Sequence, residues 1–273
     1  MKMKTKDLLR QLKTKDIAVF GTGFVAEMFY EALQIHDLTS KIRCFVVSQA
    51  SQNQRLHDRP VYPAEGLDLP EGVLLCVAVH ESAAKEVMQT LKAYADRTVW
   101  IYPNLLELLY GMPDESRRRM PLVQFMSGQD PGEHWLSVRY AAVRDYLSGA
   151  QRYPKTKDLY LRAMALHCQP ATALRRLRQA EELADSIQAE GFHSDSPVCV
   201  DDSGRIIDGL HRVCCAAYLR LESIPVTVYP SSPVFDRVLG DKNRLPERIL
   251  LDGGFSAEEI LFLREAWHEM TGR

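Results

Sequence analysis

Five consecutive residues, Asp208-Gly209-Leu210-His211-Arg212, bring together side chains that are suited to handling phosphate. An arginine guanidinium can make two parallel hydrogen bonds to phosphate oxygens, and a histidine can contact a phosphate oxygen. An aspartate can hold Mg²⁺ or accept a proton from a hydroxyl group. The same residues also suit a structural turn, in which a His–Arg pair braces the start of a helix. The surrounding sequence therefore has to decide between a phosphate site and a brace.

The flanking sequence predicts that these residues lie at a turn from a strand into a helix. Two strands of a hairpin, a helix rich in small residues and a further strand are expected at 197–200, 205–207, 213–221 and 224–228. Gly209 would make the turn, and His211 and Arg212 would lie in the first helical turn. Unpaired N–H groups and the positive end of the helix dipole favour an anion there, so the order of parts favours a phosphate site.

In this order of parts, the stretch from Pro197 to Tyr229 resembles the ParB/sulfiredoxin superfamily. ParB-type domains carry Gly-Glu-Arg-Arg at this point, sulfiredoxins carry Gly-Cys-His-Arg, and the free-serine kinases of the superfamily carry Asp-Gly-His-His-Arg. The motif of this chain is most similar to that of the kinases. Leu210 stands where sulfiredoxins have their cysteine, so repair of sulfinic acids is not expected.

The resemblance implies a nucleotide-binding phosphotransferase, similar to a kinase, that uses ATP, ADP or CTP with Mg²⁺. Its acceptor would be a small hydroxyl-bearing metabolite, amino acid or sugar. The residues that bind the nucleotide would be Gly209, Leu210, His211 and Arg212. Asp208 and His211 would be catalytic, and Asp208 would also be the metal ligand. The general base of the kinases has no clear match here, and Glu181 and Glu182 are the candidates.

A second glycine turn lies near the start of the chain. The apolar run at 17–20 leads into Gly21-Thr22-Gly23-Phe24-Val25-Ala26 and then a predicted helix, which is the opening of a Rossmann-like unit. Gly21 would make the turn, Gly23 would allow close approach of a ligand, and Ala26 would let helix and sheet pack. Further strands at 41–48, 72–79 and 98–102 and a helix at 82–95 predict a parallel α/β sheet.

The ligand of this unit stays open. Val47-Ser48-Gln49 stands where a dinucleotide site needs an acidic residue for the ribose, which weakens the case for NAD. The run from Ile17 to Leu67 resembles the small Rossmann-like domains found at the front of sugar O-acyltransferases and beside methyltransferases of bacterial polysaccharide pathways. This resemblance implies either a nucleotide-sugar or dinucleotide at Gly21 and Gly23, or a scaffold without a ligand. His80 is interpreted as a cap or surface residue.

The whole chain is predicted to form an α/β protein of two domains: an N-terminal Rossmann-like parallel sheet domain and a C-terminal α+β domain of the ParB/sulfiredoxin kind. The boundaries are 1–111 for the first, 112–133 for a linker and 134–273 for the second. The prolines, glycine and three arginines of GMPDESRRRMP mark the linker. Further helices are expected at 134–149, at 172–190 and from Ser256, where Glu259 completes a capping box. The helical stripe Arg175, Arg176 and Arg178 is most simply a solvated helical face, but one of these arginines could reach a phosphate on the neighbouring loop.

Composition limits the partners. The chain of 273 residues has 34 Lys+Arg and 36 Asp+Glu, a net charge of -2, so nucleic acid is not an expected partner. No apolar run approaches a membrane span of about 20 residues, and the basic start has no apolar leader segment, so a cytoplasmic protein is predicted. The 6 cysteines are predicted to be buried reduced thiols. The alternative function is a non-catalytic regulatory protein that responds to a nucleotide or binds a sugar nucleotide, and a homo-oligomer is left open.

Overall fold

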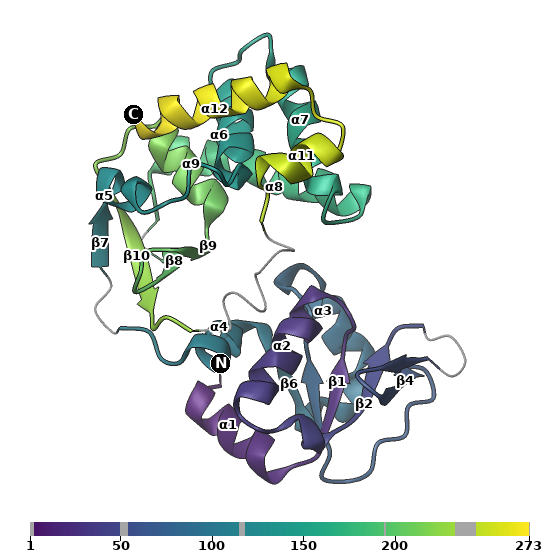
Figure 1. The fold of residues 1–273 in the computed structure, drawn as a ribbon. Coiled ribbons are helices and arrows are strands. Elements are labelled where there is room, and N and C mark those ends of the chain that lie inside the picture. The colour runs from purple at the N-terminus through teal and green to yellow at the C-terminus, as the bar shows by residue number, and fades with distance from the viewer. Residues whose placement is uncertain (1–2, 50–53, 115–117, 194, 233–243, 273) are drawn as a thin grey trace. The chain divides into compact units, whose positions relative to one another are not determined.

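The computed structural model describes residues 3–49, 54–114, 118–193, 195–232 and 244–272, and it shows an α/β protein, as predicted. The chain divides into two compact units, Met1–Met112 and Pro113–Arg273. Each unit has its own sheet and helices (Figure 1). The two units are therefore described one at a time.

The first unit is built on a sheet of six strands in the order β3-β4-β2-β1-β5-β6. The strands are β1 (Ile17–Phe20), β2 (Ile42–Val47), β3 (Arg55–Leu56), β4 (Arg59–Pro63), β5 (Leu74–Val77) and β6 (Thr98–Trp100). All neighbours are parallel except β3 and β4. The order of the strands reverses between β1 and β5, where open α/β sheets place their ligands. Each of the parallel strands expected from the sequence is present.

Helices complete the first unit: α1 (Thr5–Thr14), α2 (Phe24–Ile35), α3 (Glu81–Thr90), α4 (Leu105–Tyr110), and short 3-10 helices at Thr39–Lys41, Lys92–Arg97 and Tyr102–Asn104. Alternate residues of the central strands, such as Ala18 and Phe20, form a buried cluster with Val87 of α3 and with Leu91 and Tyr94 after it. Asn104 donates to the Met3 carbonyl at 2.9 Å and so ties α1 to α4. The core is thus closed by elements from both ends of the unit.

The second unit contains a mixed sheet of four strands in the order β7-β10-β8-β9. The strands are β7 (Arg118–Pro121), β8 (Val198–Asp201), β9 (Ile206–Asp208) and β10 (Ser223–Tyr229). β10 is parallel to β8, and the two outer pairings are antiparallel. The hairpin of β8 and β9 and the strand after the helix lie where the sequence places them.

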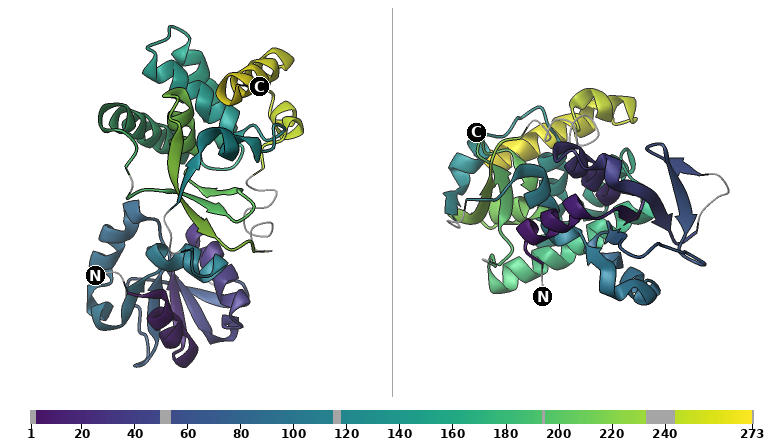
Figure 2. Two further views of the ribbon diagram at one scale, coloured as in Figure 1. Left: turned by 90° about the vertical axis from the view of Figure 1, so that its left-hand side faces the viewer. Right: turned by 90° about the horizontal axis from the view of Figure 1, so that it is seen from below.

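Helices pack together in the second unit: α5 (Leu122–Ser127), α6 (Trp135–Leu147), α7 (Tyr153–Ala165), α8 (Pro170–Glu190), α9 (Leu210–Tyr218), α11 (Glu247–Asp252) and α12 (Ala257–Thr271). α6 is buried along Trp135 to Asp145, because α7, α8, α9 and α12 all contact it (Figures 1 and 2). The capping box of Ser256 and Glu259 is confirmed at the start of α12. α7 was not expected from the sequence.

The range 112–133, expected as a linker, contains β7 and α5. β7 pairs with β10, and Phe125 and Met126 of α5 are buried in the core of the second unit. Arg119 donates to the side-chain and backbone oxygens of Ser223 at 3.0 and 2.9 Å. Arg117, the first residue of the arginine run, lies outside the described residues. The prolines and charges of this stretch thus accompany an edge strand, where both are tolerated.

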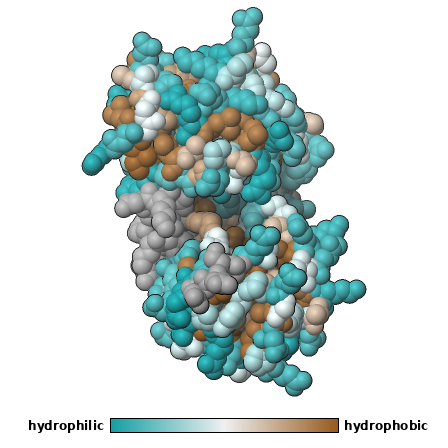
Figure 3. All heavy atoms as spheres, turned by 90° about the vertical axis from the view of Figure 1, so that its right-hand side faces the viewer, coloured by the Kyte–Doolittle hydropathy of each residue, from teal (hydrophilic) through white to brown (hydrophobic). Residues whose placement is uncertain are grey.

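Hydrophilic side chains cover most of the face drawn in Figure 3, and apolar residues form small groups between them. Among the helices that the structure describes, none has the length and apolar character needed to cross a membrane.

Candidate functional site

Gly209 begins the predicted site. It is the N-cap of α9, and its φ of 107° lies in the left-handed region that favours glycine. A Cβ atom here would lie 3.2 Å from Cγ2 of Val198, so a larger residue would also crowd β8. No side chain caps this helix start. Asp208 therefore ends a strand, and His211 and Arg212 lie in the first turn of α9, as the sequence predicts.

Arg212 is held by the loop that precedes β8. Its Nη1 group donates to the carbonyls of Ser196 and Pro197, both at 2.7 Å, and to Oγ of Ser196 at 2.8 Å. Its Nη2 group donates to Oδ2 of Asp208 at 2.7 Å. The Asp208 side chain is 63% exposed, whereas that of Arg212 is 14% exposed. These bonds of Arg212, which we call the latch, join α9 to the end of β9 through Asp208 and to the segment before β8 through Ser196 and Pro197.

His211 lies away from this latch and points into the helices. Its Nε2 atom is 2.9 Å from Oη of Tyr160, a residue of α7 that is fully buried. Burial lowers the pKa of His211 well below its ordinary value, and the positive charges of Arg139, Arg176 and Arg212 add to the effect. Near neutral pH the imidazole is therefore uncharged and surrounded by positive charge. Of the three arginines in the predicted helical stripe of α8, Arg176 is the one that acts on it.

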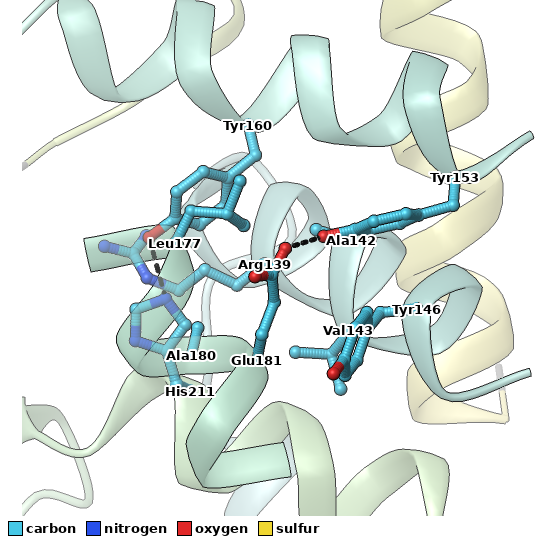
Figure 4. Close-up of a pocket in the computed structure, with 10 residues that line it drawn as sticks. All are labelled: Arg139, Ala142, Val143, Tyr146, Tyr153, Tyr160, Leu177, Ala180, Glu181 and His211. Atoms are coloured by element: carbon cyan, nitrogen blue, oxygen red, sulfur yellow. Dashed lines mark hydrogen bonds between the residues drawn. The ribbon is translucent and has the colours of Figure 1, made fainter. Parts of the chain in front are cut away.

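His211 lines a cavity between four helices, α6, α7, α8 and α9 (Figure 4). The cavity is small, with room for about one water molecule. Arg139 and Tyr160 lie beside His211, and Tyr153 and Glu181 lie farther along (Figure 4). The cavity therefore contains a cation and a carboxylate from different helices.

Glu181 already has partners in this cavity. The Tyr153 hydroxyl donates to it, and Nζ of Lys157 is 3.8 Å from its Oε1 atom. Burial and this hydrogen bond raise the pKa of Tyr153, so the phenol stays protonated. Of the two glutamates considered as a base, Glu181 thus lines the cavity of His211, while Glu182 is exposed on α8.

Arg139, which sequence reasoning missed, is the most buried charge of the cavity. Its residue is 7% exposed, and burial lowers the pKa of its guanidinium. Nη1 donates to the carbonyl of Trp135 at 3.1 Å, and the guanidinium lies 4.5 Å above the Trp135 ring. Nε has no hydrogen-bond partner. The sequence spacing could have indicated its burial, because Arg139 follows Trp135 by four residues and therefore lies on the apolar face of the helix.

The glycine turn of the first unit has different surroundings. Gly21 has a φ of 118°, and a Cβ atom there would lie 2.7 Å from the carbonyl oxygen of Ala78, which follows β5. Gly23 is the N-cap of α2, and a Cβ atom there would meet nothing within 4 Å. His80 caps α3, because its Nδ1 atom accepts from the Ser82 N–H at 3.3 Å, which confirms one of the two predicted roles. Close packing therefore requires a glycine at position 21 but not at position 23.

The cysteines and acidic residues form no further centre among the residues that the structure describes. All 6 cysteines are free thiols, and burial raises the pKa of Cys44 and Cys199 to about 11. No group of three or more His, Cys, Asp or Glu side chains is placed to hold a metal ion in the described part of the chain.

Comparisons of the chain with models of protein families, with curated proteins and with solved structures found no match.

Proposed function

We propose that the second unit binds a nucleotide at the first turn of α9 and transfers its terminal phosphoryl group to a small hydroxyl-bearing molecule. The observation that carries this proposal is the first turn of α9, which begins at Gly209 without a side-chain cap and has the Arg212 guanidinium beside it. Such a turn favours an anion, because its N–H groups and the nearby guanidinium groups all offer hydrogen-bond donors or positive charge. The resemblance of the motif to the ParB/sulfiredoxin superfamily, and to its free-serine kinases above all, supports a nucleotide as that anion.

Each residue of the motif then has a role. Gly209 keeps the backbone close to the phosphates, and the N–H groups of Leu210 and His211 donate to them. Arg212 neutralises the charge that develops during phosphoryl transfer. His211 contributes its backbone N–H, because its uncharged ring points into the helices and bonds to Tyr160.

Asp208 fits the part of a Mg²⁺ ligand. Mg²⁺ in phosphotransferases is usually held by one or two carboxylates and the phosphates, so a larger cluster of protein ligands is not needed. The Asp208 carboxylate is exposed and ends a strand beside the turn, which supports this role. The cation would supply charge for the phosphoryl group, and Asp208 would position it. Asp208 is also the exposed carboxylate that can accept the proton of the acceptor hydroxyl, because Glu181 is enclosed in the cavity and bonded to Tyr153.

The latch of Asp208 and Arg212 favours a second candidate, a non-catalytic protein that responds to a nucleotide. Phosphates would compete with Asp208 and with the carbonyls of Ser196 and Pro197 for the Arg212 guanidinium. Binding would then release the loop before β8, which is a conformational signal without chemistry.

For the first unit we propose a Rossmann-like scaffold. Gly21 is explained by its close approach to Ala78, so the turn needs no ligand to account for its glycine. A nucleotide-sugar or dinucleotide at Gly23 is the alternative, since open space lies there. Binding of a nucleotide-sugar or of NADP that Gly23→Val abolishes would establish this alternative.

Calorimetric titration of ATP, ADP and CTP with Mg²⁺ into the full chain tests the proposal. Arg212→Ala removes a charge-assisted contact worth about 1.5–3 kcal/mol, so affinity is expected to fall roughly 10- to 150-fold. Arg178→Ala, on the same unit, is the control for general loss of charge and should change affinity little. Unchanged affinity in a folded Arg212→Ala protein would refute the phosphate site.

Turnover separates the two candidates. Incubation with each nucleotide and a mixture of small hydroxyl-bearing metabolites should consume nucleotide if the protein is a phosphotransferase. Asp208→Asn is then expected to retain nucleotide binding and to lose metal-dependent turnover. Tight binding without consumption would instead support the regulatory protein.

A further inference from the structure

Arg139 is a buried cation without a counter-charge. No carboxylate of the described residues forms an ion pair with it, and its Nε atom has no hydrogen-bond partner. Burying an unpaired charge is costly, because the interior replaces water poorly as a solvent for ions. The nearby Trp135 ring and carbonyl offset only part of that cost.

A second buried arginine of the same helix shows how this unit treats a structural guanidinium. Arg144 is 6% exposed, and it pairs with the buried Asp145 at 2.8 Å and with Glu269. Both arginines lie on α6, and both are equally inaccessible to water. Nη2 of Arg144 also lacks a hydrogen-bond partner, so what distinguishes Arg139 is the missing counter-charge.

The one carboxylate in the cavity of Arg139 is committed elsewhere. Glu181 accepts from the Tyr153 hydroxyl and lies near Lys157. Figure 4 shows its carboxylate turned toward Tyr153, while the guanidinium of Arg139 lies beside Tyr160 and His211. No carboxylate of the described residues therefore neutralises the Arg139 guanidinium, and an anion from outside the chain could do so.

We propose that this cavity is a second anion site, in which Arg139 receives the carboxylate or phosphate group of a small molecule other than the nucleotide. Because the cavity has room for about one water molecule, it admits a single oxygen atom of the anionic group, and the rest of that group and of the ligand lies outside it. The Tyr160 hydroxyl lies beside the guanidinium but is already bonded to His211, so Arg139 is the donor on which the site depends. His211 connects the two sites, because it belongs to the first turn of α9 and also lines this cavity.

This inference adds a second ligand to the proposed function, and it can fail independently of it. The sites are distinguished by their arginines: Arg212 serves the nucleotide and faces the loop before β8, while Arg139 serves the second anion and lies between the helices. A substitution at one is expected to leave binding at the other within about threefold, since the two do not share a hydrogen bond.

The experiment follows the Nε–H signals of arginine in the ¹⁵N-labelled full chain by NMR. The Arg139 signal is assigned by its loss in Arg139→Met, and potassium phosphate, sodium acetate and, as a control for ionic strength, sodium chloride are titrated separately. We expect phosphate or acetate to shift this signal to saturation and chloride to leave it in place. The anion that saturates at the lower concentration distinguishes a phosphate from a carboxylate ligand.

Thermal unfolding supplies the matched control. Arg139→Met removes an unpaired buried charge and keeps the apolar stem, so its Tm should equal or exceed that of the wild type, with anion affinity at least roughly tenfold weaker. Arg144→Met removes a buried charge that is paired with Asp145 and Glu269, so its Tm should fall.

Two results would overturn the proposal: an Arg139 signal that neither anion moves, or a Tm of Arg139→Met that falls as far as that of Arg144→Met. If either result were found and Arg212→Ala still lost nucleotide binding, the proposed function would be supported and the second anion site refuted. A shifted Arg139 signal in a protein that binds no nucleotide would support the second anion site and refute the first.

Discussion

The two units use the same backbone device with different neighbours. In each, a strand ends at a glycine with positive φ and a helix begins within three residues. Around Gly21, the nearest atoms are the Ala78 carbonyl and an apolar side chain, whereas around Gly209 they include the guanidinium of Arg212. The turn itself is therefore no evidence of a phosphate. The charges that other elements bring to it make the difference.

Replacement of Gly21 by alanine should have the largest effect on stability. The new Cβ atom would meet backbone at 2.7 Å and the residue would keep a strained φ, so we expect a loss of roughly 2–4 kcal/mol in the first unit. Gly23→Ala, in open space, should cost less than about 1 kcal/mol. Hydrogen exchange of the β1 amides measures both, with the β8 amides as reference. Equal losses would show that close packing does not explain Gly21.

Gly209→Ala tests the second turn and should cost roughly 1–3 kcal/mol, because its clash is with side chains that can move. Since the new Cβ atom would lie 3.2 Å from Nε of Arg212, nucleotide affinity should fall as well. Gly23→Ala serves again as the control and should leave nucleotide affinity unchanged. If both substitutions weakened nucleotide binding equally, the ranking of the two turns would be wrong.

The smallest effect concerns pH. Histidine in the unfolded chain takes up a proton below about pH 6.5, while folded His211 resists protonation because its pKa is lowered. The free energy of unfolding should therefore fall as pH drops below 6.5, by up to about 1.4 kcal/mol per pH unit for each such histidine. Burial lowers the pKa of His134 too, so it acts in the same direction.

Urea unfolding of the second unit at several pH values between 5 and 7 checks this prediction. The quantity compared is the slope of the free energy of unfolding against pH. His211→Gln should flatten the dependence, His134→Gln should do so in part, and the double variant should be flattest. A slope in His211→Gln equal to that of the wild type would mean that His211 is not held neutral. The charge around the α9 turn would then be weaker than we infer.

Local patterns of sequence were sufficient for much of the fold. The turn at Gly209, the strands of the first sheet and the capping box at Ser256 each depend on residues within a few positions, which a pattern can register. β7 and α5 were hidden because prolines and arginines surround them, and their stability comes from β10 and the core. α7 begins with a proline and two lysines, which are typical of a loop, and its buried apolar residues, such as Leu159 and Met164, come in its second half and pack against neighbouring helices.

The candidate site was predictable as a list of residues but not as a set of contacts. The motif names Asp208, His211 and Arg212, yet nothing local says that Arg212 binds the carbonyls before β8 while His211 turns toward Tyr160. The burial of Arg139 could not be decided from the local sequence either. A charged residue on an apolar stripe can reach solvent or stay buried, and only the neighbouring helices decide which.

The pairing of β7 with β10 also bears on the order in which the two units fold during synthesis. Arg119 and Ser223, which hold the two strands together, are 104 positions apart. During synthesis, the first unit is complete before β7 emerges, whereas β7 must wait until the chain has been made as far as β10 before its partner exists. Contacts of such long range slow folding. We therefore expect the first unit to fold while the ribosome is still at work and the second to fold late and all at once.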